Sequence, residues 1–136
     1  MSPPRQRFRR RPDQAVTAVQ LRLDTDGLVY RKWGDLQRAR AGDWLVDNDG
    51  DVYTVAADSF AATYREVSPG RFVKSAPVWA VQAGSAGSVV TREGRTHHAA
   101  GDWLVSNQPD GGDAYAISAE RFAQLYEPDD PGLSAV

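Results

Sequence analysis

The sequence AGDWLV stands at residues 41–46 and returns unchanged at residues 100–105. Five residues that follow the first copy recur after the second at the same spacing: Tyr53, Ala57, Phe60, Ala61 and Tyr64 answer Tyr115, Ala119, Phe122, Ala123 and Tyr126. Chance is a poor explanation for so many matches at fixed separations. The sequence therefore predicts two tandem copies of one module of about 60 residues.

The matches also suggest where each copy begins and ends. Upstream of the shared motif, Val16 and Gly34 answer Val78 and Gly94. We expect a basic N-terminal arm at 1–11, a first module at 12–68, a second module at 69–127 and a flexible C-terminal tail at 128–136. A lone unit of this size buries only about 60% of its unfolded surface, so the two modules should pack together as one pseudo-symmetric body.

Local patterns repeat in the same order within each copy. Apolar and β-branched residues predict strands at 16–23, 28–33 and 43–46, and at 78–82, 88–92 and 102–105. Asn48, Asp49 and Gly50 predict a hairpin turn into a strand at 51–56. Aromatic residues four apart predict short helices at 57–64 and 119–126, and a further strand is expected at 72–74. The expected fold is mainly β with short helices, as two SH3-like half-open barrel modules packed together.

Composition limits the classes of protein to which the chain can belong. Apolar residues make up 41% of it and charged residues 25%, as in an ordinary folded protein. No apolar run approaches the roughly 20 residues that cross a bilayer, so we expect a cytoplasmic protein without a membrane segment. The chain has no cysteine, which excludes disulfides, thiol nucleophiles and cysteine-ligated zinc.

Positive charge is concentrated at the start of the chain. The basic residues of the arm are Arg5, Arg7, Arg9, Arg10 and Arg11. Removing these five from the 16 basic residues leaves 11 against 18 acidic ones, a net charge of −7 for the remainder. Such an arm is a flexible tail, or it contacts nucleic acid, an acidic partner or the acidic body itself.

Both copies carry motifs that are similar to a PGDYG-like family of short phage and bacterial proteins, mostly of unknown function. Its pattern runs R-K-K-P-V, T-x-E-G, P-G-D-W/Y and a closing F-x-x-T-Y-E. The first copy matches at residues 10–12, 42–44 and 63–64, and the second at 91–94, 101–103 and 126–127. The proline of the turn is replaced by Ala41 and Ala100, and Trp33 stands where the glutamate is expected. The resemblance implies a prokaryotic or phage setting and a fold, and it transfers no catalytic residue.

Residues that both copies share predict scaffold rather than function. They form the signature turn and the expected core: Gly42, Asp43, Trp44, Phe60 and Tyr64, with Gly101, Asp102, Trp103, Phe122 and Tyr126. Each aspartate follows a glycine at a strand entrance, where a carboxylate can accept backbone N–H bonds. We therefore expect a structural role for both.

Catalytic and metal-binding patterns are weak throughout the chain. The acidic run at 47–51 lacks the glycine and glutamate spacing of a calcium loop, and a hairpin tip explains it. His97 and His98 would face opposite sides of a strand, which suits neither chelation nor a proton relay. Neither a nucleophile elbow nor a phosphate loop occurs. We expect no metal, no cofactor and no catalytic set.

Residues without a counterpart in the other copy are the candidates for binding. They are Trp33, Trp79, Arg31, Lys32, His97 and His98. The two tryptophans either fill the junction between the copies or form a recognition surface. The leading hypothesis is a non-enzymatic protein, monomeric or weakly dimeric, that binds a protein or small ligand at the groove between copies or at a sheet edge. The alternatives are nucleic-acid binding through the arginine arm and residues 31–33, and a small hydrolase that uses His97 or His98.

Overall fold

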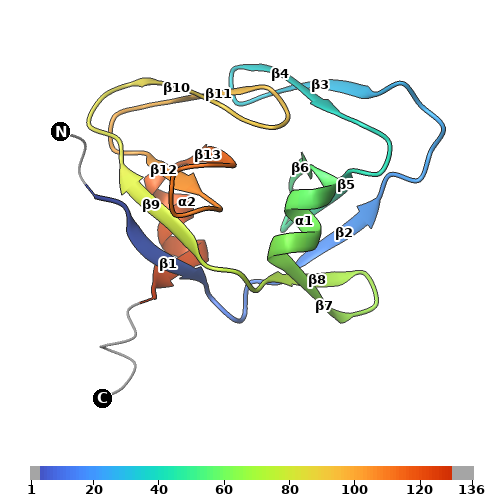
Figure 1. Ribbon diagram of the computed structural model, residues 1–136, viewed down its shortest axis with the longest axis horizontal. Helices are drawn as coiled ribbons and strands as arrows, with labels where there is room; N and C mark the ends of the chain where they lie inside the picture. Colours follow the sequence, from blue (N-terminus) through green and yellow to red (C-terminus); the bar gives the residue numbers. More distant parts are fainter. Residues whose placement is uncertain (1–3, 130–136) are drawn as a thin grey trace.

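The computed structural model describes residues 4–129, within which fourteen strands and two short helices form (Figure 1). The strands are β1 (Gln6–Arg10), β2 (Val16–Gln20), β3 (Leu28–Lys32), β4 (Asp35–Ala39), β5 (Trp44–Asn48), β6 (Asp51–Val55), β7 (Tyr64–Ser68), β8 (Arg71–Lys74), β9 (Val78–Gln82), β10 (Gly87–Val90), β11 (Arg95–His98), β12 (Trp103–Ser106), β13 (Ala114–Ile117) and β14 (Tyr126–Pro128). The helices are α1 (Ala57–Thr63) and α2 (Ala119–Leu125). The prediction of a mainly β protein with short helices is confirmed.

The strands are organised as two five-stranded sheets and two separate hairpins. The first sheet has the order β6-β5-β2-β8-β7, and the second has the order β13-β12-β9-β1-β14. The hairpins are β3–β4 and β10–β11. Each position in the first sheet therefore has a counterpart in the second, with α1 after β6 and α2 after β13. Both sheets are open, and no closed barrel forms within residues 4–129.

The N-terminal strand β1 lies inside the second sheet, between β9 and β14. Figure 1 shows it in dark blue beside the yellow and red strands of the other end of the chain. Phe8 and Arg10 are buried while Arg7 and Arg9 are exposed, the period of two that a half-buried strand requires. Residues 6–10 are therefore a paired, half-buried strand and not a flexible tail, because inward-facing residues alternate with outward-facing arginines. In the first sheet, β8 fills the same place between β2 and β7.

Each sheet packs on an aromatic core of the same geometry. In the first core Trp44 stacks on Phe60 with ring centroids 4.2 Å apart, and Phe72 meets both rings edge-on. The second core repeats this arrangement, with a stacking distance of 4.3 Å, in Trp103, Phe122 and Phe8. Edge-on and offset contacts of this kind add stability beyond the buried area alone.

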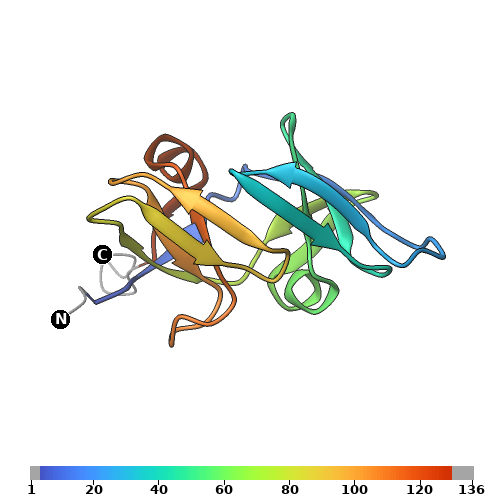
Figure 2. The ribbon, with the colours of Figure 1, turned by 90° about the horizontal axis from the view of Figure 1, so that it is seen from above.

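The two hairpins lie side by side across the top of both halves (Figures 1 and 2). An isolated bridge pairs Gln37 with Gly94, and the backbone N–H of His97 donates to the carbonyl of Trp33 at 3.0 Å. The side chain of Gln37 is fully buried, and its Nε2 donates to the carbonyl of Arg95 at 2.8 Å. These contacts join the two halves on the side opposite the segment that links β8 to β9.

The hairpin at residues 48–50 and both short helices form as predicted. The first strand ends at Gln20 rather than 23, because the backbone N–H of Leu21 turns to the carbonyl of Asp43. Strands β4 and β11 were not predicted, since their sequences, DLQRA and RTHH, are mostly polar. Within residues 4–129, neither helix has the length and apolar character that crossing a membrane requires.

A candidate ligand-binding cleft between the two sheets

A cleft of about 470 Å³ lies at the junction of the two halves. The first half contributes residues of β6, α1 and β8 to its lining, and the second contributes residues of β1, β13 and β14. The β3–β4 turn and the β10–β11 hairpin complete the lining. Its size is typical of small-molecule sites, which range from about 300 to 1,000 Å³.

Two buried cations line this cleft, one from each sheet. Lys74 ends β8 and is 5% exposed, and Arg10 ends β1 and is 6% exposed. They occupy equivalent places, because Lys74 is paired across the strands with Tyr64 and Arg10 with Tyr126. The repeat therefore places a positive charge beside the same tyrosine in each half.

Tyrosine hydroxyls are the partners of both cations. Lys74 Nζ donates to the hydroxyl of Tyr115 at 3.1 Å, and Arg10 Nη2 donates to that of Tyr126 at 3.2 Å. The hydroxyls of Tyr115 and Tyr126 are themselves 2.6 Å apart. Lys74, on the first sheet, is thereby connected to Arg10 on the second through a pair of phenols.

Neither cation has a carboxylate partner among the residues that the structure describes. The ion pairs found within residues 4–129 leave out both Lys74 and Arg10, and Nε and Nη1 of Arg10 are buried without any hydrogen-bond acceptor. Asn107 Oδ1, also in the lining, is a further buried atom without a partner. Unpaired buried charge is costly, and unsatisfied buried polar groups in a folded protein require an explanation.

The two charges alter the ionisation of the neighbouring phenols. Burial opposes ionisation of Tyr126, but the positive charges of Arg10 and Lys74, with hydrogen bonds from Tyr115 and Arg10, outweigh it and lower its pKa to about 7. Tyr64 is half-buried, and loss of solvent around its hydroxyl raises its pKa to about 12. The two equivalent tyrosines therefore differ in charge near neutral pH.

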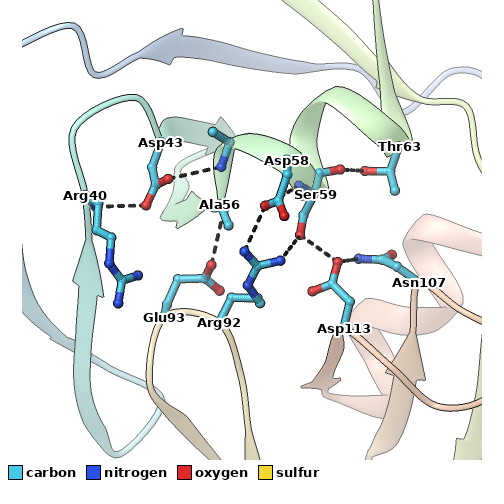
Figure 3. A network of polar contacts seen from close by, with 11 residues as sticks. Arg40, Asp43, Ala56, Asp58, Ser59, Thr63, Arg92, Glu93, Asn107 and Asp113 are labelled. Carbon is cyan, nitrogen blue, oxygen red and sulfur yellow. Dashed lines mark hydrogen bonds and ion pairs between the residues drawn. The ribbon is translucent and has the colours of Figure 1, made fainter.

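A polar network braces the two halves beside the cleft, as Figure 3 shows. Ser59 Oγ on α1 donates to Asp113 Oδ2 at 2.6 Å, and Asp113 also accepts from Asn107 Nδ2 at 3.0 Å. An ion pair of 2.9 Å joins Arg92 to Asp58 at the start of α1. The contacts of Ser59 with Asp113 and of Asp58 with Arg92 therefore join α1 of the first half to the second half.

Glu93 is a second carboxyl group beside this network that, like Asp113, lines the cleft. Its Oε2 accepts from the backbone N–H of Ala56 at 3.2 Å. Burial raises the pKa of Glu93 to about 7, and the negative charges of Asp113 and Asp43 act in the same direction. Close to neutral pH this side chain is therefore only partly ionised.

The aspartates of the shared turn bind backbone groups. Asp43 accepts from the N–H groups of Arg40 at 2.8 Å and Ala57 at 3.0 Å, which connects the β5 entrance to the first turn of α1 (Figure 3). Asp102 accepts from the N–H of Ala99 at 2.9 Å. The glycines before them, at 42 and 101, both have a positive φ near 91°, which favours glycine at this place in the turn.

Trp33 lies at the rim of the cleft in an unusual backbone conformation. It occupies the β3–β4 turn with φ of 55°, and Gly34 follows with φ of 81°. Its ring is 5.8 Å from that of Tyr53 and lines the cleft. An aromatic residue is rare in this left-handed region, and such positions concentrate at functional sites.

The other residues predicted for binding are spread over different surfaces. His97 and His98 line the cleft from β11, and His97 Nε2 lies 3.3 Å from a carboxylate oxygen of Asp35. Lys32 is paired with Asp51 at 2.7 Å. Arg31 is exposed on β3, and Trp79 is half-buried on β9; neither lines the cleft.

The arginines of the N-terminal segment have separate environments. Arg7 is paired with Asp129 at 2.9 Å, and Arg9 lies 3.6 Å from Glu127. Arg11 donates to the carbonyl of Ala123, and the guanidinium of Arg5 lies against Gly111. Only Arg10 turns inward to the cleft.

Sequence reasoning did not select Lys74 or Tyr115 as site residues. A signal was present, because Phe8 and Phe72 are equivalent in the repeat and each is followed two residues later by a basic side chain. On a strand that residue faces the same side as the buried phenylalanine. A basic residue at that position in both halves indicates a shared buried charge.

Comparison of the chain with protein-family models, with curated proteins and with solved structures returned no match.

Proposed function

We propose that this protein binds a small ligand in the cleft between its two sheets and carries out no reaction of its own. The supporting observation is a cleft of about 470 Å³ whose lining combines aromatic rings with buried polar groups that lack partners. Pockets that combine apolar walls with a few convergent polar groups are the usual form of small-molecule sites. The strained backbone of Trp33 at the rim adds to this support.

The proposal is tested with four one-ring probes of different charge: benzoate, phenyl phosphate, benzamide and benzylamine. Amide NMR spectra of the isotope-labelled full chain are followed up to about 10 mM probe, since fragments of this size bind in the millimolar range. At least one probe should saturably shift amides that line the cleft from both sheets, such as Thr54 and Ala116.

A blocking variant makes the test specific. Ala116→Phe places a ring in the cleft lining, whereas Ala99→Phe adds the same ring at an exposed position outside it. We expect about tenfold weaker binding in the first variant and unchanged binding in the second. If no probe saturates the cleft resonances, or if Ala116→Phe binds as well as wild type, the proposal is wrong.

We also propose that the chain is organised as two tandem copies of an SH3-like module. Support comes from the repeated AGDWLV motif and from the matching order of strands in the two sheets. On this interpretation the cleft is an interface between copies, so each copy contributes equivalent side chains to it. An alternative form of the proposal is that a protein partner binds at the same groove, in a bacterial or phage setting. A protein partner would need a larger contact surface than a small ligand.

Nucleic-acid binding remains the rival prediction. Four arginines of the N-terminal segment contact the protein itself, and Lys32 is paired with Asp51. The ion pairs of Arg7, Arg9 and Lys32 reduce the free positive charge that would attract a phosphate backbone. The rival predicts binding of short oligonucleotides that weakens steeply with salt. A fluorescence titration at low salt with single- and double-stranded oligonucleotides distinguishes it from the cleft proposal.

A further inference from the structure

We infer that the ligand carries an anionic group, a carboxylate or a phosphate, which binds against Arg10 and Lys74 at the base of the cleft. This inference rests on the proposed function and specifies its ligand. The first argument is the state of the two cations. Both are at least nine-tenths buried and both line the cleft, yet neither contacts a carboxylate within residues 4–129.

Arg10 cannot remove its charge by losing a proton, because the guanidinium of arginine stays protonated in proteins. Exposed basic residues of the same chain do find carboxylates: Arg7 is paired with Asp129, and Arg92 with Asp58. Within residues 4–129, the two buried cations thus lack the carboxylate partner that Arg7 and Arg92 have. An isolated buried charge costs several kcal/mol unless an opposite charge compensates it.

The phenols around the cations compensate only part of this charge. The titratable groups that surround Tyr126 come from five strands: Arg10 on β1, Lys74 on β8, Tyr64 on β7, Tyr53 on β6 and Tyr115 on β13. Tyr126, with a pKa of about 7, supplies at most one negative charge. Burial raises the pKa of Tyr53, Tyr64 and Tyr115, so these three stay neutral at physiological pH. At least one positive charge is left over for a ligand.

The carboxylates of the cleft lining are engaged elsewhere. Asp113 accepts from Ser59 and Asn107, and Asp51 is paired with Lys32. Glu93 accepts from Ala56, and its raised pKa reduces its charge. An anionic ligand group at Arg10 and Lys74 would therefore meet the positive side of the cleft, while tyrosine rings and Trp33 offer surface to an apolar or aromatic body.

The same four probes test the inference, because they differ mainly in charge. Benzoate and phenyl phosphate should bind at least about tenfold more tightly than benzamide, and benzylamine should be the weakest. Comparison of benzoate with phenyl phosphate shows whether the site prefers a carboxylate or a phosphate. Equal binding of benzoate and benzamide would overturn the inference and leave the proposed function intact. Failure of all four probes would instead count against the proposed function.

Variants assign the charge preference to the two cations. Lys74→Met and Arg10→Met should each lower benzoate affinity about tenfold and leave benzamide affinity unchanged. Arg65→Met removes the same charge from an exposed position of β7 outside the cleft and serves as the control. If Arg10→Met does not fold, the inference is still tested by Lys74→Met and by the preference of the wild-type protein for benzoate over benzamide. An unaltered preference for benzoate in Lys74→Met would contradict the role given to that residue.

Discussion

The two sheets have the same strand order, but the position next to the central strand, β2 in one sheet and β9 in the other, is filled in different ways. In the first sheet β8 follows directly from β7 through a tight turn at Gly70, which has φ of 74°. In the second sheet β1 comes from the opposite end of the chain, and Arg10 pairs with Tyr126. Equivalent geometry is thus reached once through local contacts and once through distant ones. The second sheet, and the Arg10 side of the cleft, depend on the N-terminal strand.

Deleting residues 1–10 should produce the largest effect, because it removes β1 from between β9 and β14. We expect the amides of the second sheet to lose hydrogen-exchange protection, while those of β2, β5 and β6 retain part of theirs. Amide exchange followed by NMR measures both sheets in one sample. Equal loss of protection in the two sheets would show that the halves fold only as a single unit.

The two equivalent phenylalanines provide the next comparison. Phe8 is 7% exposed and Phe72 is 8% exposed, and each contacts a stacked tryptophan–phenylalanine pair. Phe8→Ala and Phe72→Ala should each lower the free energy of unfolding by about 3–5 kcal/mol, the usual cost of emptying an aromatic core position. Urea unfolding measures both. A much smaller loss for Phe8→Ala would mean that β1 contributes little to its sheet.

Glu93 has no acidic counterpart, since Trp33 occupies the equivalent position in the first half. The pKa of Glu93 in the folded protein is about 7, above the ordinary value of 4.5. Glu93 therefore loses its proton at a lower pH in the unfolded chain than in the folded protein, and the free energy of unfolding falls as pH rises between those two values. Glu93→Gln should raise the free energy of unfolding at pH 8 by about 1–3 kcal/mol and have little effect at pH 4. Denaturation at both pH values measures this, with exposed Glu66→Gln as the control. A Glu93→Gln variant that is less stable at pH 8 would contradict the burial argument.

Much of the fold of the two halves could be predicted from sequence. The repeat predicted the hairpin at 48–50, the short helices and the positions of Trp44 and Phe60 in a core, because these depend on local turn chemistry and on aromatic spacing. The hairpin strands β4 and β11 escaped prediction because they are polar, and they are held by pairing with β3 and β10 and by a few contacts between the two hairpins. Tertiary contact of that kind leaves no periodic signal in a short segment.

The site was harder to predict than the fold. Shared residues were assigned to the scaffold, yet Tyr64 and Tyr126 also line the cleft. Trp33 was selected because it lacks a counterpart, and it lies at the rim. Arg10 was assigned to a basic arm, since nothing local indicates that β1 pairs with a strand at the other end of the chain. A residue at an interface between copies can be repeated and still belong to a site, so repetition alone does not separate the two roles.

The most direct test of the account is the ionisation of Tyr126, which reports whether Arg10 and Lys74 make the base of the cleft positive. Tyrosinate absorbance at 295 nm is measured from pH 5 to 9 in wild type, Tyr126→Phe and the equivalent Tyr64→Phe. We predict one tyrosine that ionises with a pKa of about 7 in wild type and in Tyr64→Phe, and no such step in Tyr126→Phe. A wild-type protein without tyrosinate below pH 9, or a step that survives in Tyr126→Phe, would contradict the account.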